Sequence, residues 1–395
     1  MSYYVKKAFL KGDYSGVPSK SISHRVLLLA TLVDEFEINN CLIAKDTLET
    51  IKAIEALGFS VKINENKLII NKVKKVEMAT ISLSESASTL RFIIPFSLLH
   101  VNRLEIALSD NLKRRFNDIY QEIFKNEKIE YIIKANKVII SGSLRGHKYF
   151  IPKTISSQFI SGLLMTLPFV KGDSQIVLDE TPSKPYLDIT IDLLERMGIK
   201  IEKNEEGYFI KGSQKITKNN YEVENDYSNA AFFLVANHLG ADIKMKSLNK
   251  DSKQGDKEIY NLIRQKEINL YHYPDLAPIL FVYAALQDYS IKFRGLENLV
   301  YKESNRLDKM LFNLSLVGAK FSLEGDELTF YPAKLVGGVK VSDYNDHRIA
   351  MSMIILGSVL AEGLVINSIS SIDKSYPTFI DDFKLLGGII DVSWI

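Results

Sequence analysis

The chain has 395 residues, of which 46% are hydrophobic and 25% charged, and its formal net charge is +2. This length suffices for two or three domains, because a single core stops growing beyond roughly 250–300 residues. Lys plus Arg (50) nearly balance Asp plus Glu (48), which excludes the global basic field of a nucleic-acid-binding protein. Any anion binding must therefore be local.

A single cysteine, Cys41, excludes an internal disulfide framework and a cysteine-based zinc site. It lies in the apolar run Cys41–Ala44, so we interpret it as a small buried hydrophobe rather than a nucleophile. No stretch approaches the roughly 20 apolar residues that span a bilayer, and no apolar run of signal-peptide length opens the chain. We therefore expect a cytoplasmic protein that binds neither membrane nor nucleic acid.

The first predicted helix begins at about Ser21, after the extended segment that ends at Pro18. Apolar side chains recur on one of its faces, at Ile22, Val26, Leu29 and Val33. Its first turn holds Lys20, Ser21 and Arg25, beside backbone N–H groups that have no helical partner. This cluster predicts a site for phosphate or carboxylate. The alternative is an ordinary capped helix with a solvated arginine.

One pattern recurs along the chain: a helix that ends in an apolar residue and glycine, then a strand, a polar turn and a second strand. The clearest helices end at Gly58, Gly198 and Gly318, and weaker copies cover Tyr120–Ser141, Ile259–His272 and Phe379–Trp394. In the first copy, Asp46 and Glu49 are predicted to form a capping box. Copies about 50 to 70 residues apart are too long for a solenoid repeat. We predict six α/β units, three per domain, with the polar segment Gln214–Asn220 as the linker.

Three further predicted helix starts carry hydroxyl, amide or charged groups, in Ile155–Gly162, Glu85–Arg91 and Asn345–Arg348. Such groups suit sugar-like hydroxyls and phosphate oxygens, although well-capped helices use the same residue types. Pro95 is predicted to kink the second of these helices. For Lys302, Glu303 and Arg306, which would share one helical face, the alternative is a surface i,i+4 ion pair.

Seven segments occur in a distinctive order: SKSISHR, ISSQFISGLL, SKPYLDIT, PDLAP, KESNR, NDHRIAM and DKSYPTF. Between about Gly12 and Gly388 they resemble the 5-enolpyruvylshikimate-3-phosphate synthase family of enolpyruvyl transferases. The resemblance implies an α/β fold of two domains with three βαβαββ units each, and an active site in the interdomain cleft. It implies an inserted domain of residues 18–224, and a domain of residues 1–17 plus 225–395 that contains both termini and the first strand.

The activity that this resemblance implies is transfer of the enolpyruvyl group of phosphoenolpyruvate to the 5-hydroxyl of shikimate 3-phosphate. The reaction releases inorganic phosphate by addition and elimination through a tetrahedral ketal, on the shikimate route to chorismate and aromatic amino acids. Its partners would be these two small molecules, it would need no metal or organic cofactor, and the protein would be a monomer. Glyphosate occupies the phosphoenolpyruvate pocket of such enzymes.

The resemblance also implies the site residues. Shikimate 3-phosphate would be bound by Lys20, Ser21, Arg25, Ser156, Ser157, Gln158, Ser183, Tyr186, Asp275, Asn298 and Lys302. Phosphoenolpyruvate would be bound by Lys20, Arg115, Gln158, Arg306, Arg348 and Lys374, with the backbone near Ala87. Asp275 is our candidate base for the 5-hydroxyl. Glu303, with Lys20 or Lys374, is our candidate for handling the proton at the methylene carbon.

Four positions depart from the pattern of the family. Ala87 stands where most relatives have glycine, and we hypothesise that its methyl group crowds the pocket and weakens glyphosate binding while activity is retained. Phe116 replaces the usual proline, and Val300 replaces a common arginine. Asn305 replaces a common aspartate, which removes a carboxylate that could orient Arg306.

Two other functions stay open. The enolpyruvyl transferase that acts on UDP-N-acetylglucosamine shares this fold, but it would show Lys-Asn where this chain has Lys20-Ser21, and usually a reactive Cys or Asp in a mobile loop. A non-catalytic relative that only binds phosphorylated metabolites would have lost several charged residues. This chain retains them, at Lys20, Asp275, Glu303, Arg306, Arg348 and Lys374.

Overall fold

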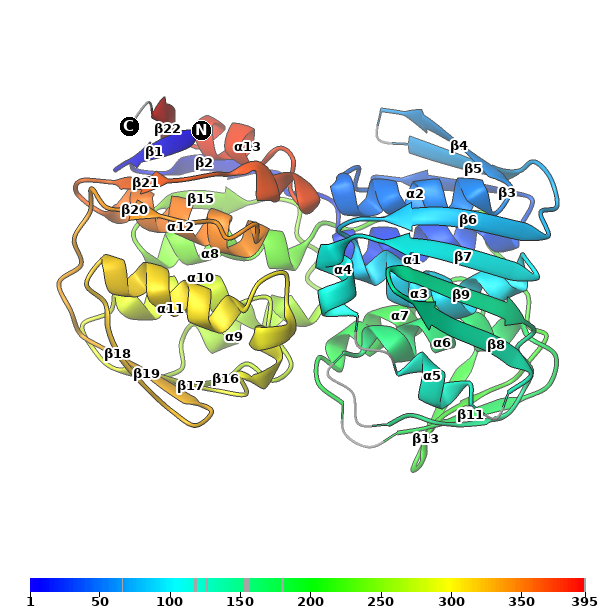
Figure 1. The fold of residues 1–395 in the computed structure, drawn as a ribbon. Coiled ribbons are helices and arrows are strands. Elements are labelled where there is room, and N and C mark those ends of the chain that lie inside the picture. Colours follow the sequence, from blue (N-terminus) through cyan, green and yellow to red (C-terminus); the bar gives the residue numbers. More distant parts are fainter. Residues whose placement is uncertain (66, 117–118, 126, 153–155, 179–180, 394–395) are drawn as a thin grey trace. The chain divides into compact units, whose positions relative to one another are not determined.

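Small sheets with helices between their strands make up the fold (Figure 1). A computed structural model describes all residues except 66, 117–118, 126, 153–155, 179–180 and 394–395. The chain divides into two compact units, which we describe separately. Unit 1 comprises Met1–Val17 and Asn225–Ile395, and unit 2 comprises Pro18–Glu224.

Unit 2 holds three four-stranded sheets in the part of the chain described. Its helices are α1 (Lys20–Leu29), α2 (Lys45–Ala56), α3 (Ala87–Phe96), α4 (Asp110–Arg115), α5 (Tyr120–Ile123), α6 (Gln158–Thr166) and α7 (Pro185–Arg196). Its short 3-10 helices are η1 (Ala30–Leu32), η2 (Ser97–Leu99) and η3 (Leu167–Phe169). One sheet has the order β14 (Asn220–Glu222), β3 (Glu35–Asn39), β5 (Lys67–Lys72), β4 (Phe59–Asn64). The second sheet has the order β6 (Met78–Leu83), β7 (Arg103–Leu108), β9 (Lys137–Gly142), β8 (Ile129–Lys134). The third has the order β10 (Lys148–Phe150), β11 (Ser174–Val177), β13 (Gly207–Ile210), β12 (Ile201–Asn204).

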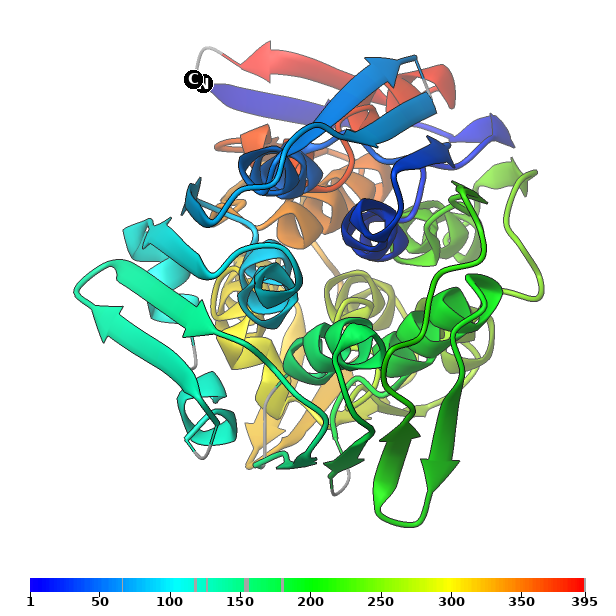
Figure 2. The same cartoon turned by 90° about the vertical axis from the view of Figure 1, so that its right-hand side faces the viewer.

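The three sheets share one architecture, a parallel pair followed by an antiparallel hairpin. Parallel strands need a crossover, and α3 supplies it between β6 and β7 as α6 does between β10 and β11. Helices α1, α2, α3, α6 and α7 contact one another. Figure 2 views the blue, cyan and green helices of this unit end-on, with its strands toward the outside. Helix α6 is buried on nearly all sides, which agrees with its strongly apolar sequence.

Unit 1 carries both ends of the chain. Its helices are α8 (Tyr227–His238), α9 (Ile259–Leu262), α10 (Ala277–Ala285), α11 (Arg306–Leu316), α12 (His347–Val359) and α13 (Phe379–Leu385), with η4 (Gly255–Glu258), η5 (Glu297–Tyr301) and η6 (Ser370–Lys374). One sheet of this unit has the order β20 (Lys340–Val341), β21 (Leu364–Ile366), β1 (Ser2–Lys6), β22 (Ile389–Ser393). A second has the order β16 (Glu267–Asn269), β17 (Ile291–Arg294), β19 (Glu327–Tyr331), β18 (Lys320–Glu324). Strands β15 (Asp242–Met245) and β2 (Lys11–Tyr14) form a separate pair. Strand β1 pairs with β21 and β22, so the first strand lies in one sheet with strands from the C-terminal end of the chain.

Several local predictions are wrong for identifiable reasons. Helix α1 begins at Lys20 but ends at Leu29, and Val33 is extended beyond η1 rather than part of the helical face. Residues 259–272 form no hairpin, because after α9 the only strand is β16, which pairs in parallel with β17. The predicted linker Gln214–Asn220 lies within unit 2, where Gln214 accepts a hydrogen bond from the Lys200 amide at 2.8 Å. Trp394, at the end of the last predicted copy, lies outside the described residues.

The predicted capping box of α2 is also wrong. The residue before the helix is Ala44, whose amide donates to Thr47 Oγ1 at 2.9 Å, and Asp46 and Glu49 make other contacts. Pro95 lies inside α3, and the chain changes to the tighter η2 at Ser97.

Cys41 is 5% exposed, and burial raises the pKa of its thiol to about 12, which confirms the interpretation as a buried small side chain. Along the described segments, no helix combines the length and apolar character of a membrane span.

Candidate active site

In unit 2, Arg25 of α1 is a buried cation, and all of its acceptors among the described residues are neutral. It is 2% exposed. Its guanidinium donates to Thr190 Oγ1 (2.7 Å), Ser161 Oγ (3.1 Å) and the carbonyls of Ser21 (2.7 Å) and Tyr186 (3.1 Å), and it lies 4.9 Å from the Phe92 ring centroid. Burial lowers the pKa of Arg25 to about 10. A buried charge without a countercharge is costly, and an anionic ligand would relieve that cost.

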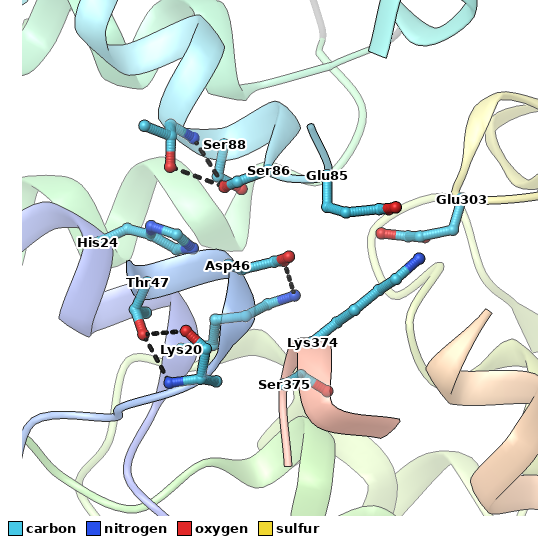
Figure 3. A network of polar contacts seen from close by, with 12 residues as sticks. Lys20, His24, Asp46, Thr47, Glu85, Ser86, Ser88, Glu303, Lys374 and Ser375 are labelled. Carbon is cyan, nitrogen blue, oxygen red and sulfur yellow. Dashed lines mark hydrogen bonds and ion pairs between the residues drawn. The ribbon is translucent and has the colours of Figure 1, made fainter. Parts of the chain in front are cut away.

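Lys20, the first residue of α1, is paired with a carboxylate that the sequence analysis assigned to another role. Its ammonium lies 2.9 Å from Asp46 Oδ2 of α2 (Figure 3). The two side chains are 14% and 9% exposed. A cation at a helix N-terminus opposes the helix dipole, and an anion at that position is favoured. Asp46, in the first turn of α2, therefore both suits its own helix and holds the Lys20 ammonium in place.

The start of α3 connects several predicted site residues through Arg91. Arg91 donates to Gln158 Oε1 at 2.6 Å and to the Arg115 carbonyl at 3.0 Å. Gln158 Nε2 donates to Ser88 Oγ at 2.8 Å. Ala87, the first residue of α3, is 5% exposed. The structure therefore brings together the segments of Ala87, Arg115 and Gln158.

Arg91 was missed as a site residue, although it lies within a segment that the sequence analysis singled out. It is 7% exposed, and its Nη1 lies 3.5 Å from Ser156 Oγ. A sequence signal was present, because Arg91 follows Ala87 by four residues and so shares its helical face.

A chain of hydroxyl groups joins α1, α2 and α3 in the same unit. Thr89 Oγ1 donates to Ser86 Oγ at 2.7 Å and lies 2.7 Å from Thr50 Oγ1, which in turn lies 2.7 Å from His24 Nδ1. The Thr89 hydroxyl has one proton, and it donates that proton to Ser86. Thr50 must therefore donate to Thr89, and His24 Nδ1–H must donate to Thr50. Burial, with the charges of Lys20 and Arg25, lowers the pKa of His24 well below 6.5, which agrees with a neutral ring.

The remaining predicted residues of unit 2 lie at other helix starts. Ser157 precedes α6 and is 2% exposed. Ser183 has φ of 56°, the left-handed region, two residues before α7.

In unit 1, Asp275 is the centre of an ion cluster. Its carboxylate lies 2.9 Å from Arg306 Nη1, 3.2 Å from Arg348 Nη2 and 3.4 Å from Lys302 Nζ. Burial and the Arg306 charge lower the pKa of Lys302, and Asp275 opposes this shift. The structure thus joins three predicted cations around the predicted base.

Arg306 is 1% exposed and meets two further carboxylates, Glu303 Oε2 at 2.5 Å and Asp346 Oδ2 at 3.0 Å. Burial opposes its charge, but Asp346, Glu303 and Asp275 outweigh burial and raise the pKa of Arg306. The alternative of a surface i,i+4 pair is therefore wrong, because α11 begins only at Arg306 and this side chain faces the protein interior.

The other predicted residues of unit 1 surround the starts of α12 and η5. Asp346 precedes α12 and accepts from the Arg348 amide at 2.9 Å. Lys374 is 4% exposed and donates to the Asn345 carbonyl at 2.9 Å. Asn298 in η5 is 5% exposed, and its Nδ2 has no hydrogen-bond partner among the described residues, so it can donate to a ligand.

Three of the residues that depart from the family pattern, Asn305, Phe116 and Val300, lie in different environments. Asn305 accepts from the Asp308 amide and so caps α11, while Arg306 has its carboxylates from elsewhere. Phe116 packs against the core of unit 2, and Val300 is exposed. Within the described residues, no group of three or more His, Cys, Asp or Glu side chains is arranged to hold a metal ion.

Comparison with known proteins gives one family. A family model described as EPSP synthase (3-phosphoshikimate 1-carboxyvinyltransferase) matches residues 6–265 and 258–383. The 3-phosphoshikimate 1-carboxyvinyltransferase of Clostridium perfringens (strain ATCC 13124) is 36% identical over 411 residues, covering 96% of this chain and 97% of that protein. The protein of the same name from Clostridium novyi (strain NT) is 37% identical over 420 residues, covering 97% and 96%. EPSP synthase from Acinetobacter baumannii has the same fold, with a TM-score of 0.82 at 19% identity and 99% of each chain covered.

Proposed function

The chain belongs to the EPSP synthase family, and from this premise we propose that it transfers the enolpyruvyl group of phosphoenolpyruvate to shikimate 3-phosphate. The acceptor is the 5-hydroxyl, and the products are 5-enolpyruvylshikimate 3-phosphate and inorganic phosphate. The reaction belongs to the shikimate route to chorismate and aromatic amino acids. Arg25 is the single observation that carries this proposal, since its buried guanidinium donates only to neutral groups and suits an anionic substrate.

Shikimate 3-phosphate is assigned to neutral hydroxyl and amide groups, a few cations and the Asp275 carboxylate, which would accept from the 5-hydroxyl. In unit 2 these are Lys20, Ser21, Arg25, Ser156, Ser157, Gln158, Ser183 and Tyr186, and in unit 1 they are Asp275, Asn298 and Lys302. Buried hydroxyl and amide groups, such as Ser157 and the Nδ2 of Asn298, support this assignment because the substrate carries hydroxyls and phosphate oxygens.

Phosphoenolpyruvate is assigned mainly to arginine and lysine side chains. These are Lys20, Arg115, Arg306, Arg348 and Lys374, together with Gln158 and the backbone at Ala87. Arginine binds carboxylate and phosphate in a fork geometry, which supports its use for a substrate that carries both groups. The first N–H groups of α3 add donors that no helical carbonyl can accept.

The proposed chemistry needs a base and an acid. Asp275 accepts the proton of the 5-hydroxyl while that oxygen bonds to C2 of phosphoenolpyruvate, and the methylene carbon takes up a proton. Glu303, with Lys20 or Lys374, donates that proton in the addition step. In the elimination step the same groups remove a proton from this carbon as phosphate departs and the double bond forms again. The Arg306 and Arg348 charges beside Asp275 pair with the carboxylate of phosphoenolpyruvate and stabilise the negative charge that develops on the phosphate as its bond to C2 breaks.

The test is phosphate release by the purified protein. We expect release that requires both phosphoenolpyruvate and shikimate 3-phosphate and that collapses in Asp275→Ala. Release with UDP-N-acetylglucosamine in place of shikimate 3-phosphate would contradict the proposal. Thermal stabilisation by shikimate 3-phosphate without any release would instead indicate the non-catalytic relative. A saturating ligand, at about 100 times its Kd, stabilises by roughly 2.7 kcal/mol, so this arm is measurable.

Monomeric state and cytoplasmic location complete the proposal. Both proposed substrates are multiply charged, and such ions do not cross a bilayer unaided. We therefore propose that the enzyme acts in the cytoplasm, in the same compartment as the enzymes that make its substrates. Light scattering of the purified protein tests the monomer.

A further inference from the structure

The Glu49 side chain of α2 binds the backbone of the loop that precedes α3. Its Oε1 accepts from the amides of Ser84 and Glu85 at 3.0 Å each, and its Oε2 accepts from the amide of Ser86 at 3.0 Å. The Ser84 hydroxyl donates to Oε1 as well. One half-buried carboxylate therefore satisfies three consecutive backbone N–H groups.

The carbonyl groups of the same three residues are also occupied. Ser109 Oγ donates to the Ser84 carbonyl (2.6 Å), Arg115 Nη1 to the Glu85 carbonyl (3.1 Å) and the Leu90 amide to the Ser86 carbonyl (3.1 Å). Each peptide group of residues 84–86 is thus fixed on both sides. On the N–H side, Glu49 accepts from all three amides.

This arrangement determines which donors are left for a ligand at the start of α3. Ala87 and Ser88 are the first two helical residues, and their N–H groups point along the helix axis without a helical acceptor. The N–H groups of residues 84–86, which would otherwise extend that anion-binding array, already hold the Glu49 carboxylate as an internal anion. The array open to a ligand is therefore short and rigid.

We infer that Glu49 is a positioning residue for phosphoenolpyruvate, since it fixes residues 84–86 so that the N–H groups of Ala87 and Ser88 are set in place for the anion. The inference rests on the proposed function and deepens it. Preorganisation of this kind lowers the entropy that the ligand must otherwise remove on binding. The Thr50–Thr89–Ser86 hydrogen bonds hold the same helix start from the next residue of α2.

The experiment compares three variants of the full chain. Glu49→Ala removes every contact with the loop. Glu49→Gln keeps one oxygen but presents an NH2 group to the Ser86 amide, so it removes the charge and part of the contact. Glu55→Gln is the matched control, because Glu55 is an exposed glutamate of the same helix.

We expect Glu49→Ala to raise the KM for phosphoenolpyruvate about tenfold while the KM for shikimate 3-phosphate stays within about twofold of wild type. Glu49→Gln should give a smaller increase of the same selectivity, and Glu55→Gln none. A purely structural role would move both KM values together. Parallel changes in the two KM values, or an unchanged KM for phosphoenolpyruvate in Glu49→Ala, would overturn the inference.

Hydrogen exchange of the unliganded protein separates this inference from the proposed function. In wild type and Glu55→Gln, the amides of residues 84–86 should be protected, and in both Glu49 variants they should exchange at least about tenfold faster. Unchanged exchange would refute the anchoring whatever the activity. Absence of phosphate release in wild type, with protection lost on mutation, would refute the proposed function and leave the anchoring role of Glu49 supported.

Discussion

Arg25 Nε donates to Thr190 Oγ1 at 2.7 Å, across a separation of 165 residues in the sequence. The four hydrogen bonds that the guanidinium donates go to neutral oxygens, two on α7 (Thr190 and Tyr186), one on α6 (Ser161) and one on α1 (Ser21). Among the described residues, no ion pair of Arg25 with a carboxylate is present, so its charge is available to a ligand.

Replacing Arg25 should therefore remove substrate binding more than it removes stability. We expect Arg25→Ala to lose the thermal shift with shikimate 3-phosphate and to raise its KM, because loss of a buried charged hydrogen bond costs about 2–5 kcal/mol, or roughly 30- to 4,000-fold. The unliganded Tm should fall little, since the variant also relieves the cost of a buried cation. Arg196→Ala is the control, because Arg196 of α7 is 53% exposed and paired with Asp192. An unchanged thermal shift in Arg25→Ala would contradict the assignment.

Ala87→Gly should strengthen inhibition by glyphosate. The Ala87 methyl group is buried at the first position of α3, and relief of such crowding is worth about 1–3 kcal/mol, or roughly 5- to 150-fold in affinity. The measurement is the inhibition constant of both proteins against phosphoenolpyruvate at fixed shikimate 3-phosphate. Equal constants would remove the hypothesis that Ala87 weakens glyphosate binding.

Asn305→Asp should leave kcat/KM within about threefold of wild type. The side chain at this position caps α11 through the Asp308 amide, and aspartate caps as well as asparagine. Arg306 already has the carboxylates of Glu303, Asp346 and Asp275, so another one adds little orientation. Asn305→Ala, which loses the cap, should cost about 1 kcal/mol in urea unfolding. A tenfold gain in kcat/KM for Asn305→Asp would show that the missing carboxylate matters.

His100 should make the folded state less stable in acid. Burial, and then the Lys72 charge, lower the pKa of His100 to about 4, and its Nε2 lies 2.9 Å from Thr31 Oγ1, which donates its own proton to the Leu28 carbonyl. The unfolded chain binds this proton near pH 6.5, so below that pH it holds more protons than the folded state. The contribution of His100 is complete above about pH 6.5 and is lost as the pH falls toward 4.

The comparison with His100→Gln isolates this effect, because Gln can still donate to Thr31. Between pH 6.5 and about 4, the free energy of unfolding of wild type should fall by up to about 1.4 kcal/mol per pH unit relative to the variant. Denaturant melts at several pH values measure the difference. Parallel pH profiles would show that His100 titrates normally in the folded protein.

Much of the secondary structure, and the general location of the candidate site, follow from local patterns. The apolar face of α1 and the Lys20 and Arg25 cluster in its first turn depend on spacings within one or two helical turns. The glycine steps after α2, α7 and α11 likewise mark helix ends, because Gly58, Gly198 and Gly318 all have positive φ. The order of seven short segments was enough to indicate the family, which the comparisons then showed.

The partners of these residues were decided only by the tertiary structure. Asp46 and Glu49 were assigned to one another as a capping box, yet one holds Lys20 and the other holds residues 84–86. Spacing in sequence tells which side chains share a helical face, but not which distant chain segment packs against that face.

By itself, the sequence determined much of the secondary structure and the family, and it indicated the class of ligand that the helix starts suit. The tertiary structure alone decided that Arg25 is buried among neutral oxygens from α6 and α7, and that Arg306 is buried among three carboxylates. The physical reason is that burial and charge compensation depend on contacts between segments tens to hundreds of residues apart, and these arise only when whole helices and sheets pack together.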